Sequence, residues 1–157
     1  MKVEVWFVGK TQQRIIQEGV LDYAGRLAHY LPITFVEIPD IRNAGKLSAD
    51  QLREKEGEVI LARIQSSDRV VLLDEKGKMH TSREFSHWMD KSLQSGSQRL
   101  LFVVGGAYGF SSGLYKRSNH LLSLSKMTFS HQMVRLFLAE QLYRAMTILR
   151  NEPYHHD

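Results

Sequence analysis

Four polar residues stand near the end of the chain among residues that are otherwise almost all apolar, where they can pair with one another or serve a ligand. They are His131, Arg135, Glu140 and Arg144. Polar groups in apolar surroundings are costly unless they are paired or used. Glu140 precedes Arg144 by four residues, the favourable order for an ion pair on a helix. His131 stands at the predicted helix start, where it either caps the helix or helps its amides to hold an anion such as phosphate.

A glycine-rich turn, Gly105–Gly109, follows the predicted strand Arg99–Val104. Open α/β sheets bind ligands at the carboxyl ends of their strands, and closely spaced glycines let a ligand approach the backbone. The turn lacks both the G-x-G-x-x-G pattern of dinucleotide sites and the Gly-Lys-Ser/Thr of a phosphate loop. A tight turn and a ligand site therefore both stay open. Asp74, at the end of the strand Val70–Asp74, can likewise cap a turn or face a ligand at the same edge.

Several kinds of chemistry find no support in the sequence. The chain has no cysteine, which excludes disulfides, thiolate metal sites and cysteine nucleophiles. Its seven histidines show no metal-binding spacing, and no Ser/His/Asp arrangement stands out. We therefore expect no metal and no cofactor-free hydrolysis. The tail Asn151–Asp157 is short, polar and terminal, and by itself it indicates a frayed end.

The elements that must position these residues alternate along the chain. Apolar, β-rich runs predict strands at Val3–Gly9, Ile33–Ile38, Val70–Asp74, Arg99–Val104 and His120–Leu124. Helical spacing predicts helices around Ile15–Leu31, Ser48–Ile64, Ser82–Leu93, Leu114–Asn119 and His131–Leu149. Such alternation predicts an α/β fold with a mostly parallel sheet and helices on both faces, in one domain spanning residues 1–157.

Short polar signals predict where some of these elements begin and end. Ser48 followed by Gln51 predicts a capping box, and Ser82 is the expected cap of the helix that follows it. The run Glu75–Lys78 is expected to end the strand before it, and Asp40–Leu47 to form an exposed loop.

The last helix predicts a partner. Its apolar residues point around nearly the whole circumference of His131–Leu149. A helix that is apolar all round must be covered all round, and the sheet of a small α/β domain covers only one side. We therefore expect a homodimer with this helix inside the interface.

Composition and charge indicate which partners the protein has and where in the cell it is found. The chain has 157 residues, and its net charge of +4 and pI of about 9.4 are a weak indication of a polyanionic partner such as RNA. The start Met1–Val5 lacks the basic and apolar regions of a signal peptide, and no apolar run approaches the ~20 residues of a membrane span. We expect a cytoplasmic protein.

Six segments, in order and at matching separations, carry a resemblance to a known family. They are Val70–Asp74, Val104–Gly109, Leu122–Phe129, His131 with Arg135, Glu140–Ala145 and Pro153–His155. Together they resemble the bacterial ribosomal RNA methyltransferase H family of the SPOUT methyltransferases, over the whole chain. The resemblance implies a SPOUT fold with a C-terminal trefoil knot, a homodimer and S-adenosyl-L-methionine bound in the knot. It also implies methylation of N3 of a pseudouridine in 23S ribosomal RNA, on the assembled ribosome.

The resemblance also implies which residues form the site. The expected cofactor contacts are Leu73, Gly105, Leu124, Ser125, Lys126, Met127, Thr128 and Phe129. The expected catalytic residues are His131, Arg135, Arg144, Tyr154 and His155. An arginine would stabilise the deprotonated imide nitrogen, and His131 is the nearest candidate proton acceptor, with Tyr154, His155 or solvent as alternatives.

One position departs from the family pattern, because Ser130 stands where the family usually has proline before the histidine. A serine there can cap the helix instead. A competing hypothesis is a non-catalytic RNA-binding protein on the same fold, which would bind no S-adenosyl-L-methionine.

Overall fold

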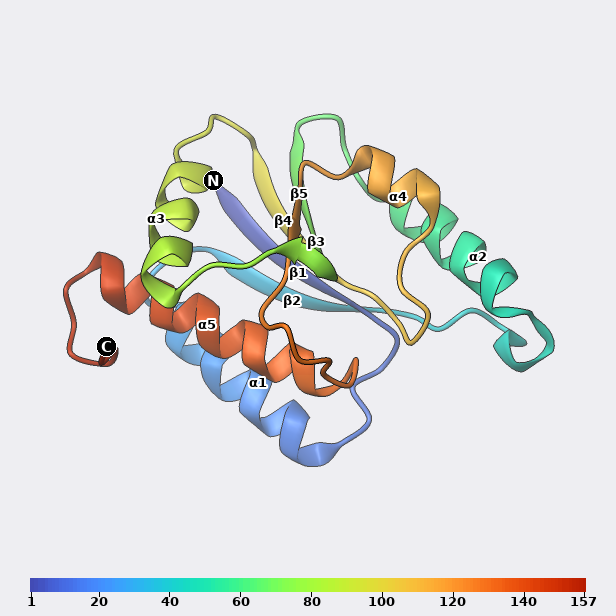
Figure 1. Ribbon diagram of the computed structural model, residues 1–157, viewed down its shortest axis with the longest axis horizontal. Helices are drawn as coiled ribbons and strands as arrows, with labels where there is room; N and C mark the ends of the chain where they lie inside the picture. The colour runs from blue at the N-terminus through green and yellow to red at the C-terminus, as the bar shows by residue number, and fades with distance from the viewer.

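Five parallel strands form one sheet in the order β2-β1-β4-β3-β5, as the computed structural model of residues 1–157 shows (Figure 1). The strands are β1 (Lys2–Val8), β2 (Ile33–Ile38), β3 (Asp68–Lys78), β4 (Arg99–Val104) and β5 (His120–Leu122). The helices are α1 (Arg14–Leu27), the 3-10 helix η1 (Ala44–Lys46), α2 (Ala49–Leu61), α3 (Ser82–Leu93), α4 (Ser112–Arg117) and α5 (Met133–Leu149). The predicted α/β fold with a parallel sheet is confirmed.

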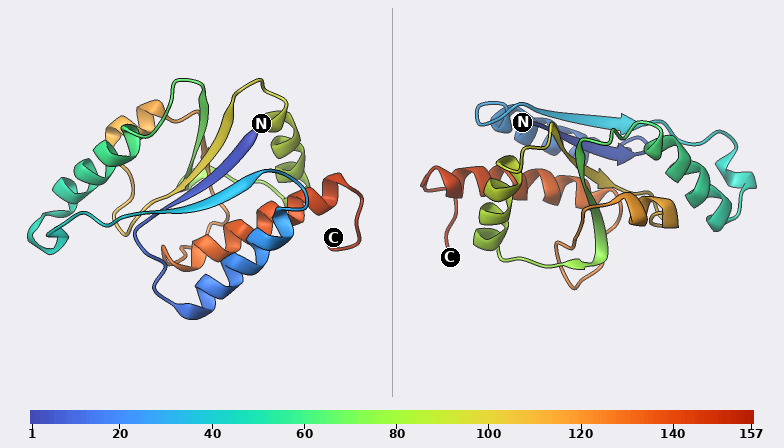
Figure 2. Two further views of the ribbon diagram at one scale, coloured as in Figure 1. Left: turned by 180° about the vertical axis from the view of Figure 1, so that it is seen from behind. Right: turned by 90° about the horizontal axis from the view of Figure 1, so that it is seen from above.

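Helices cover both faces of the sheet, and each face has its own apolar core (Figure 2). Alternate side chains of the strands pack against α1, α3 and α5 on one face, with Val5, Phe102 and Leu142 at its centre. The intervening side chains pack against α2 and α4 on the other face, where Leu101 of β4 and Ile60 of α2 belong to the second core. Burial on both faces explains why the central strands are nearly continuous apolar runs.

Two helix starts test the predicted caps. Ser48 and Gln51 form the predicted capping box at the start of α2. The expected cap at Ser82 is wrong, because Thr81 holds that position and forms a capping box with Glu84. Ser82 lies in the first turn of α3, where its hydroxyl donates to Gln141 of α5 over 2.9 Å. The helix therefore begins one residue earlier than an N-cap at Ser82 would require, and Ser82 joins two helices.

Strand β3 continues past the predicted end. Glu75–Lys78 does not terminate the strand, because Leu122 of β5 pairs with both Leu73 and Lys78 across a shift of register. Gly77 lies so close to β5 that a Cβ there would stand 2.6 Å from the carbonyl carbon of Leu121. Glycine is therefore required where the extension of β3 passes the backbone of β5.

The final strand and the short helix are also offset from their predicted bounds. β5 ends at Leu122 rather than Leu124, because the chain leaves the sheet after the amide of Ser123 donates to Lys78 over 3.0 Å. Helix α4 spans Ser112–Arg117, since Ser111 caps it and Asn119 is already bonded to Val70 of β3.

Helix α5 lies against the sheet between α1 and α3 (Figure 1). Its buried residues include Leu138, Leu142 and Ala145, which face the sheet, while Phe137 on the opposite side stays 39% exposed. The helix is therefore covered on three sides by its own chain, which leaves one partly open stripe. No helix in the structure has the length and apolar character needed to cross a membrane.

Candidate functional site

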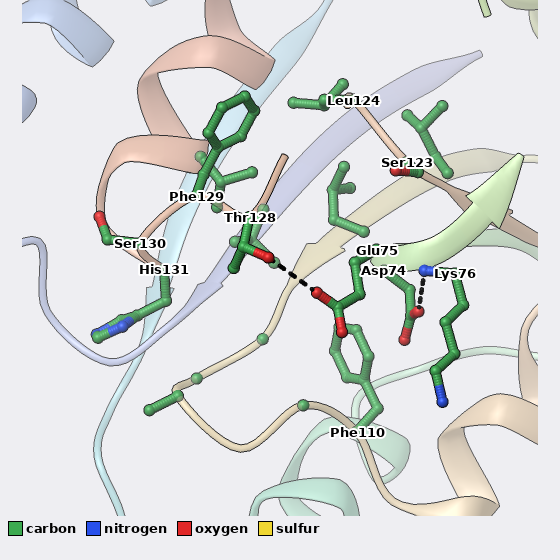
Figure 3. Close-up of a pocket in the computed structure, with 18 of the residues that line it drawn as sticks. Asp74, Glu75, Lys76, Phe110, Ser123, Leu124, Thr128, Phe129, Ser130 and His131 are labelled. Carbon is green, nitrogen blue, oxygen red and sulfur yellow. Dashed lines mark hydrogen bonds between the residues drawn. The ribbon is translucent and has the colours of Figure 1, made fainter. Parts of the chain in front are cut away.

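A cavity of about 720 Å³ opens at the carboxyl ends of β3, β4 and β5 (Figure 3). Its floor includes the last residues of these strands, Leu73, Val104 and Leu122. Its walls are the glycine turn 105–109 and the loop 123–131 that leads into α5. This is the edge at which parallel α/β sheets bind ligands, and the volume suits a small-molecule site.

The loop wall of the cavity holds its shape through short polar contacts. Ser123 donates through its hydroxyl to the carbonyl of Ser125 over 2.9 Å, and the hydroxyl of Ser125 accepts from the amide of Met127 over 2.9 Å. Leu124, Ser125, Met127, Thr128 and Phe129 line the cavity, whereas Lys126 is exposed outside its lining. Seven of the eight residues expected to contact a cofactor thus lie around one cavity, with Leu73 and Gly105 completing the set.

The glycine turn is both a tight turn and a wall of the cavity. Gly106 and Gly109 form a bridge, and Gly109 has a φ of +77°, which other residues rarely adopt. A Cβ on Gly105 would lie 3.1 Å from the ring of Phe110, which also lines the cavity. Arg53 of α2, which also lines the cavity, donates to the carbonyl of Tyr108 over 3.2 Å and supports the turn.

The extension of β3 brings acidic side chains to the cavity. Asp74 accepts from the amide of Lys76 over 2.8 Å and from the hydroxyl of Tyr115. It therefore caps a turn and lines the cavity at once. Burial, followed by the hydrogen bond to Asp74, raises the pKa of Tyr115 to about 12, so the phenol stays protonated and donates.

Glu75 reaches across the cavity to the opposite loop. Its carboxylate accepts from the hydroxyl of Thr128 over 3.4 Å (Figure 3). Glu75, Arg53, Phe110 and Tyr115 were not expected at the site, because neither their types nor their spacing connects them to the glycine turn. The one sequence feature that could have indicated Glu75 is its position next to Asp74, directly after an apolar strand.

His131 lies at the rim of the cavity, with an exposed side chain (Figure 3). The helix does not begin there, since Gln132 is the N-cap and Met133 the first residue of α5. The hydroxyl of Ser130 accepts from the amide of Met133 over 3.1 Å, so this serine satisfies one donor at the helix start although it precedes the N-cap residue. His131 is therefore free for a ligand.

Arg135 lies outside the cavity, with no exposed surface. Its guanidinium donates to the carbonyls of Val8 and Gly9 over 2.8 and 3.0 Å and to the hydroxyl of Thr11 over 2.8 Å. Burial lowers its pKa. Every one of these contacts holds the end of β1 against α5. The structure thus contradicts a direct contact between Arg135 and a substrate, and it gives the residue a positioning role.

The C-terminal tail is folded back onto α5 instead of being frayed. Glu140 and Arg144 form the predicted ion pair, with Nε of Arg144 3.0 Å from the Glu140 carboxylate. The hydroxyl of Tyr154 donates to that carboxylate over 3.0 Å, and the guanidinium lies 4.8 Å from the Tyr154 ring centre. Nη1 of Arg144 lies 3.1 Å from Nδ1 of His155. Three residues named as catalytic from the resemblance therefore form one cluster.

Burial and hydrogen bonds to Tyr23 and Glu140 raise the pKa of Tyr154. Its phenol therefore stays protonated at neutral pH, which argues against Tyr154 as a proton acceptor. The aromatic ring contacts the guanidinium of Arg144 and the ring of Tyr143, while its hydroxyl donates to Glu140.

The cavity and the tail cluster lie at opposite ends of α5. His131 and Arg144 are separated by 13 positions, which corresponds to roughly 20 Å along a helix with a rise of about 1.5 Å per residue. Figure 1 shows the chain end beside α3, away from the loop that enters α5. Within one chain, the fold therefore brings the expected cofactor contacts together with His131, but not with Arg144, Tyr154 or His155. No group of three or more possible metal ligands is present.

Known proteins resemble this chain over its full length. A family model described as "Predicted SPOUT methyltransferase" matches residues 1–155. The "Ribosomal RNA large subunit methyltransferase H" of Parabacteroides distasonis is 53% identical over 157 residues, the whole of both chains. Its namesake from Cytophaga hutchinsonii is 51% identical over 156 residues, 99% of this chain and 100% of its own. That of Porphyromonas gingivalis is 48% identical over the whole of both chains. The likeness thus includes the cavity and the tail.

Proposed function

The chain belongs to the SPOUT methyltransferases and, within them, to the ribosomal RNA large subunit methyltransferase H family, and from this premise we propose its reaction. It transfers a methyl group from S-adenosyl-L-methionine to N3 of a pseudouridine in 23S ribosomal RNA, on the assembled ribosome. The observation that supports this best is the single cavity at the strand ends, which gathers the glycine turn and the loop 123–131.

The residues around the cavity fit S-adenosyl-L-methionine, which supplies an activated methyl group on a sulfonium centre. Backbone groups of the glycine turn and of the loop 124–129 can bracket an adenine without charged side chains. Leu73 and Phe129 add apolar surface, while the carboxylates of Asp74 and Glu75 suit a ligand that carries positive charge. Aligning an already activated methyl group with its acceptor can contribute about 7–11 kcal/mol to catalysis.

The acceptor nitrogen must lose its proton, since only the anion of an imide carries a free lone pair there. A cation nearby lowers the pKa of such a nitrogen and stabilises the anion. With Arg135 buried away from the cavity, Arg144 is the cation that we assign to this role. His131, exposed at the rim, is the proton acceptor that we assign. The base must leave its stack to be reached, at a cost of a few kcal/mol.

We assign the two ends of α5 to one site through a homodimer. A two-fold axis crossing the middle of α5 would place the tail cluster of one protomer beside the cavity of its partner. The open stripe of α5, which includes Phe137 and Arg144, supplies a surface for such a contact. In this arrangement Tyr154 stacks on the extruded base, a contact that is worth roughly 1–3 kcal/mol.

Mapping methylated pseudouridine in ribosomal RNA tests the proposal. RNA from a strain that lacks the gene should have lost one N3-methylated pseudouridine of 23S ribosomal RNA. The wild-type gene should restore the mark, and the cavity variant Gly105→Val should not. An unchanged set of N3-methylated pseudouridines in the deletion strain would reject the assigned reaction. Calorimetry with S-adenosyl-L-methionine separates an enzyme from a non-catalytic RNA-binding protein, which would show no binding.

A further inference from the structure

The last residue of the chain is tied to the tail cluster by an unbroken series of polar contacts. The carboxylate of Asp157 accepts from Nε of Arg83 on α3 over 2.8 and 2.9 Å, one distance for each oxygen. The same carboxylate lies 2.9 Å from Nε2 of His155, whose Nδ1 lies 3.1 Å from Arg144. Arg144 in turn pairs with Glu140. A side chain of α3 and two carboxylates therefore set the position of one guanidinium.

The donors and acceptors in this series define the state of His155. A guanidinium only donates, so Nδ1 of His155 must accept from Arg144. In a neutral imidazole the proton then stands on Nε2, where it faces the carboxylate of Asp157. Both ring nitrogens are occupied, which leaves His155 no free lone pair for taking a proton from a substrate. In this arrangement His155 transmits a hydrogen bond.

The same contacts define which part of Arg144 is free. An arginine carries five N–H donors. Its Nε–H and one Nη2–H point to Glu140, and one Nη1–H points to His155. One N–H on each terminal nitrogen remains, on a planar group that also lies over the Tyr154 ring. Two free donors on one cationic group suit an oxygen of a planar, anionic base.

We propose that Asp157 and Glu140 are positioning residues for the methyl transfer. Glu140 holds Arg144 directly, and Asp157 holds it through the Nε2–H tautomer of His155, so that the two free N–H groups of Arg144 point at a carbonyl oxygen next to the reacting nitrogen. This inference rests on the proposed function, in which the tail cluster serves the RNA base. It extends the site to the final residue of the chain, which carries no sign of a function in the sequence.

The test compares Asp157→Ala with Asp157→Asn, which keeps an acceptor oxygen, and with His156→Ala as matched control. His156 is the exposed neighbour between the two residues of interest and has no hydrogen bond. Nitrogen-15 NMR of the imidazole, assigned with His155→Gln, reports the tautomer of His155 directly. Methylation of ribosomes at saturating S-adenosyl-L-methionine reports kcat, and calorimetry reports the affinity for the methyl donor.

We expect His155 to be the Nε2–H tautomer in the wild type, in Asp157→Asn and in His156→Ala. In Asp157→Ala the tautomers should mix, and kcat should fall about threefold to tenfold, the size of one hydrogen bond, with unchanged affinity for the methyl donor. Glu140→Gln, which loses the charge but keeps an oxygen, should lose a similar factor. A wild-type kcat in Asp157→Ala and Glu140→Gln would overturn the inference if Arg144→Lys and His155→Gln are slow. If those two are also fully active, the proposed role of the tail fails instead.

Discussion

Arg135 is the polar residue of α5 whose role depends most on distant contacts. Its bonds to Val8 and Gly9 join positions more than 120 residues apart in the chain. It also donates to the carbonyl of His131 and packs 4.9 Å from the ring centre of Phe7. This guanidinium therefore fastens the rim of the cavity to the end of β1.

Replacing Arg135 with methionine should cost about 3 kcal/mol of unfolding free energy, because several buried acceptors lose a charged donor at once. Denaturant unfolding measures this loss. Arg14→Met is the matched control, since the side chain of Arg14 is 90% exposed, and it should change stability by less than about 0.5 kcal/mol. Equal stability of the two variants would show that the buried contacts contribute nothing net.

Gly105 is the residue at which added volume should affect the methyl donor most directly. In Gly105→Val the first side-chain carbon already meets the Phe110 ring at 3.1 Å, and the branches must displace either that ring or the ligand. The affinity for S-adenosyl-L-methionine should fall tenfold or more, about 1.4 kcal/mol or greater. Calorimetry measures the affinity, and circular dichroism verifies the fold. Gly45→Val, where no atom lies within 4 Å, is the control and should bind normally.

At the scale of elements, two histidines help to join α3 to the edge of the sheet. The rings of His80 and His120 lie 5.9 Å apart, and Trp88 of α3 stacks on His120 at 4.8 Å. Nε2 of each histidine is buried and has no partner. Burial, with additional repulsion from Lys78, lowers the pKa of both below the ordinary 6.5.

The lowered pKa values of His80 and His120 predict that the stability of the fold depends on pH. A histidine whose folded pKa is lowered contributes its full stability above pH 6.5, and it loses that stability as pH falls from 6.5 towards the folded pKa. The free energy of unfolding should thus decrease between pH 7.5 and 5. In the double variant His80→Gln/His120→Gln this decrease should shrink. His29 is exposed, so His29→Gln is the control and should keep the wild-type dependence of unfolding free energy on pH. A wild-type slope in the double variant would contradict the assignment.

At the scale of the whole molecule, the separation of cavity and tail along α5 predicts complementation between protomers. Gly105→Val damages the cavity, and Tyr154→Ala damages the tail, so each variant alone should methylate at least about tenfold more slowly. In a mixed dimer one site combines an intact cavity with an intact tail. After equal mixing and subunit exchange, half of the dimers are mixed, so activity should recover to about a quarter of the wild type.

Methylation of ribosomes by the mixture, compared with each variant alone, measures this recovery. Sedimentation should show that the wild type and both variants are dimers at the assay concentration. If each site were instead formed by a single chain, every chain in the mixture would carry one damaged residue of its own site. Mixing would then restore no activity. Absence of any recovery in verified mixed dimers would contradict a site shared between protomers.

Much of the architecture follows from local sequence pattern. Strands β2 and β4 have their predicted bounds. Burial on both faces makes β4 a continuous apolar run, whereas β2, at the edge of the sheet, is recognised by its β-rich composition and by Pro39 after it. The capping box of Ser48 and the ion pair of Glu140 with Arg144 also depend only on residues three or four positions apart. The cofactor contacts were named through a family resemblance, and seven of these eight residues do line one cavity.

Tertiary structure alone decided the remaining features, because each depends on chain segments that meet only after folding. The spacing of Arg135 from His131 resembles a functional pair, yet burial against the end of β1 removes Arg135 from the cavity. The extension of β3 exists because β5 lies beside it, and Gly77 permits that approach. The tail is folded because Glu140 accepts a hydrogen bond from Tyr154 and Arg83 donates one to Asp157. Local periodicity encodes which elements form, whereas the partners of a buried or terminal polar group are set by the packing of those elements.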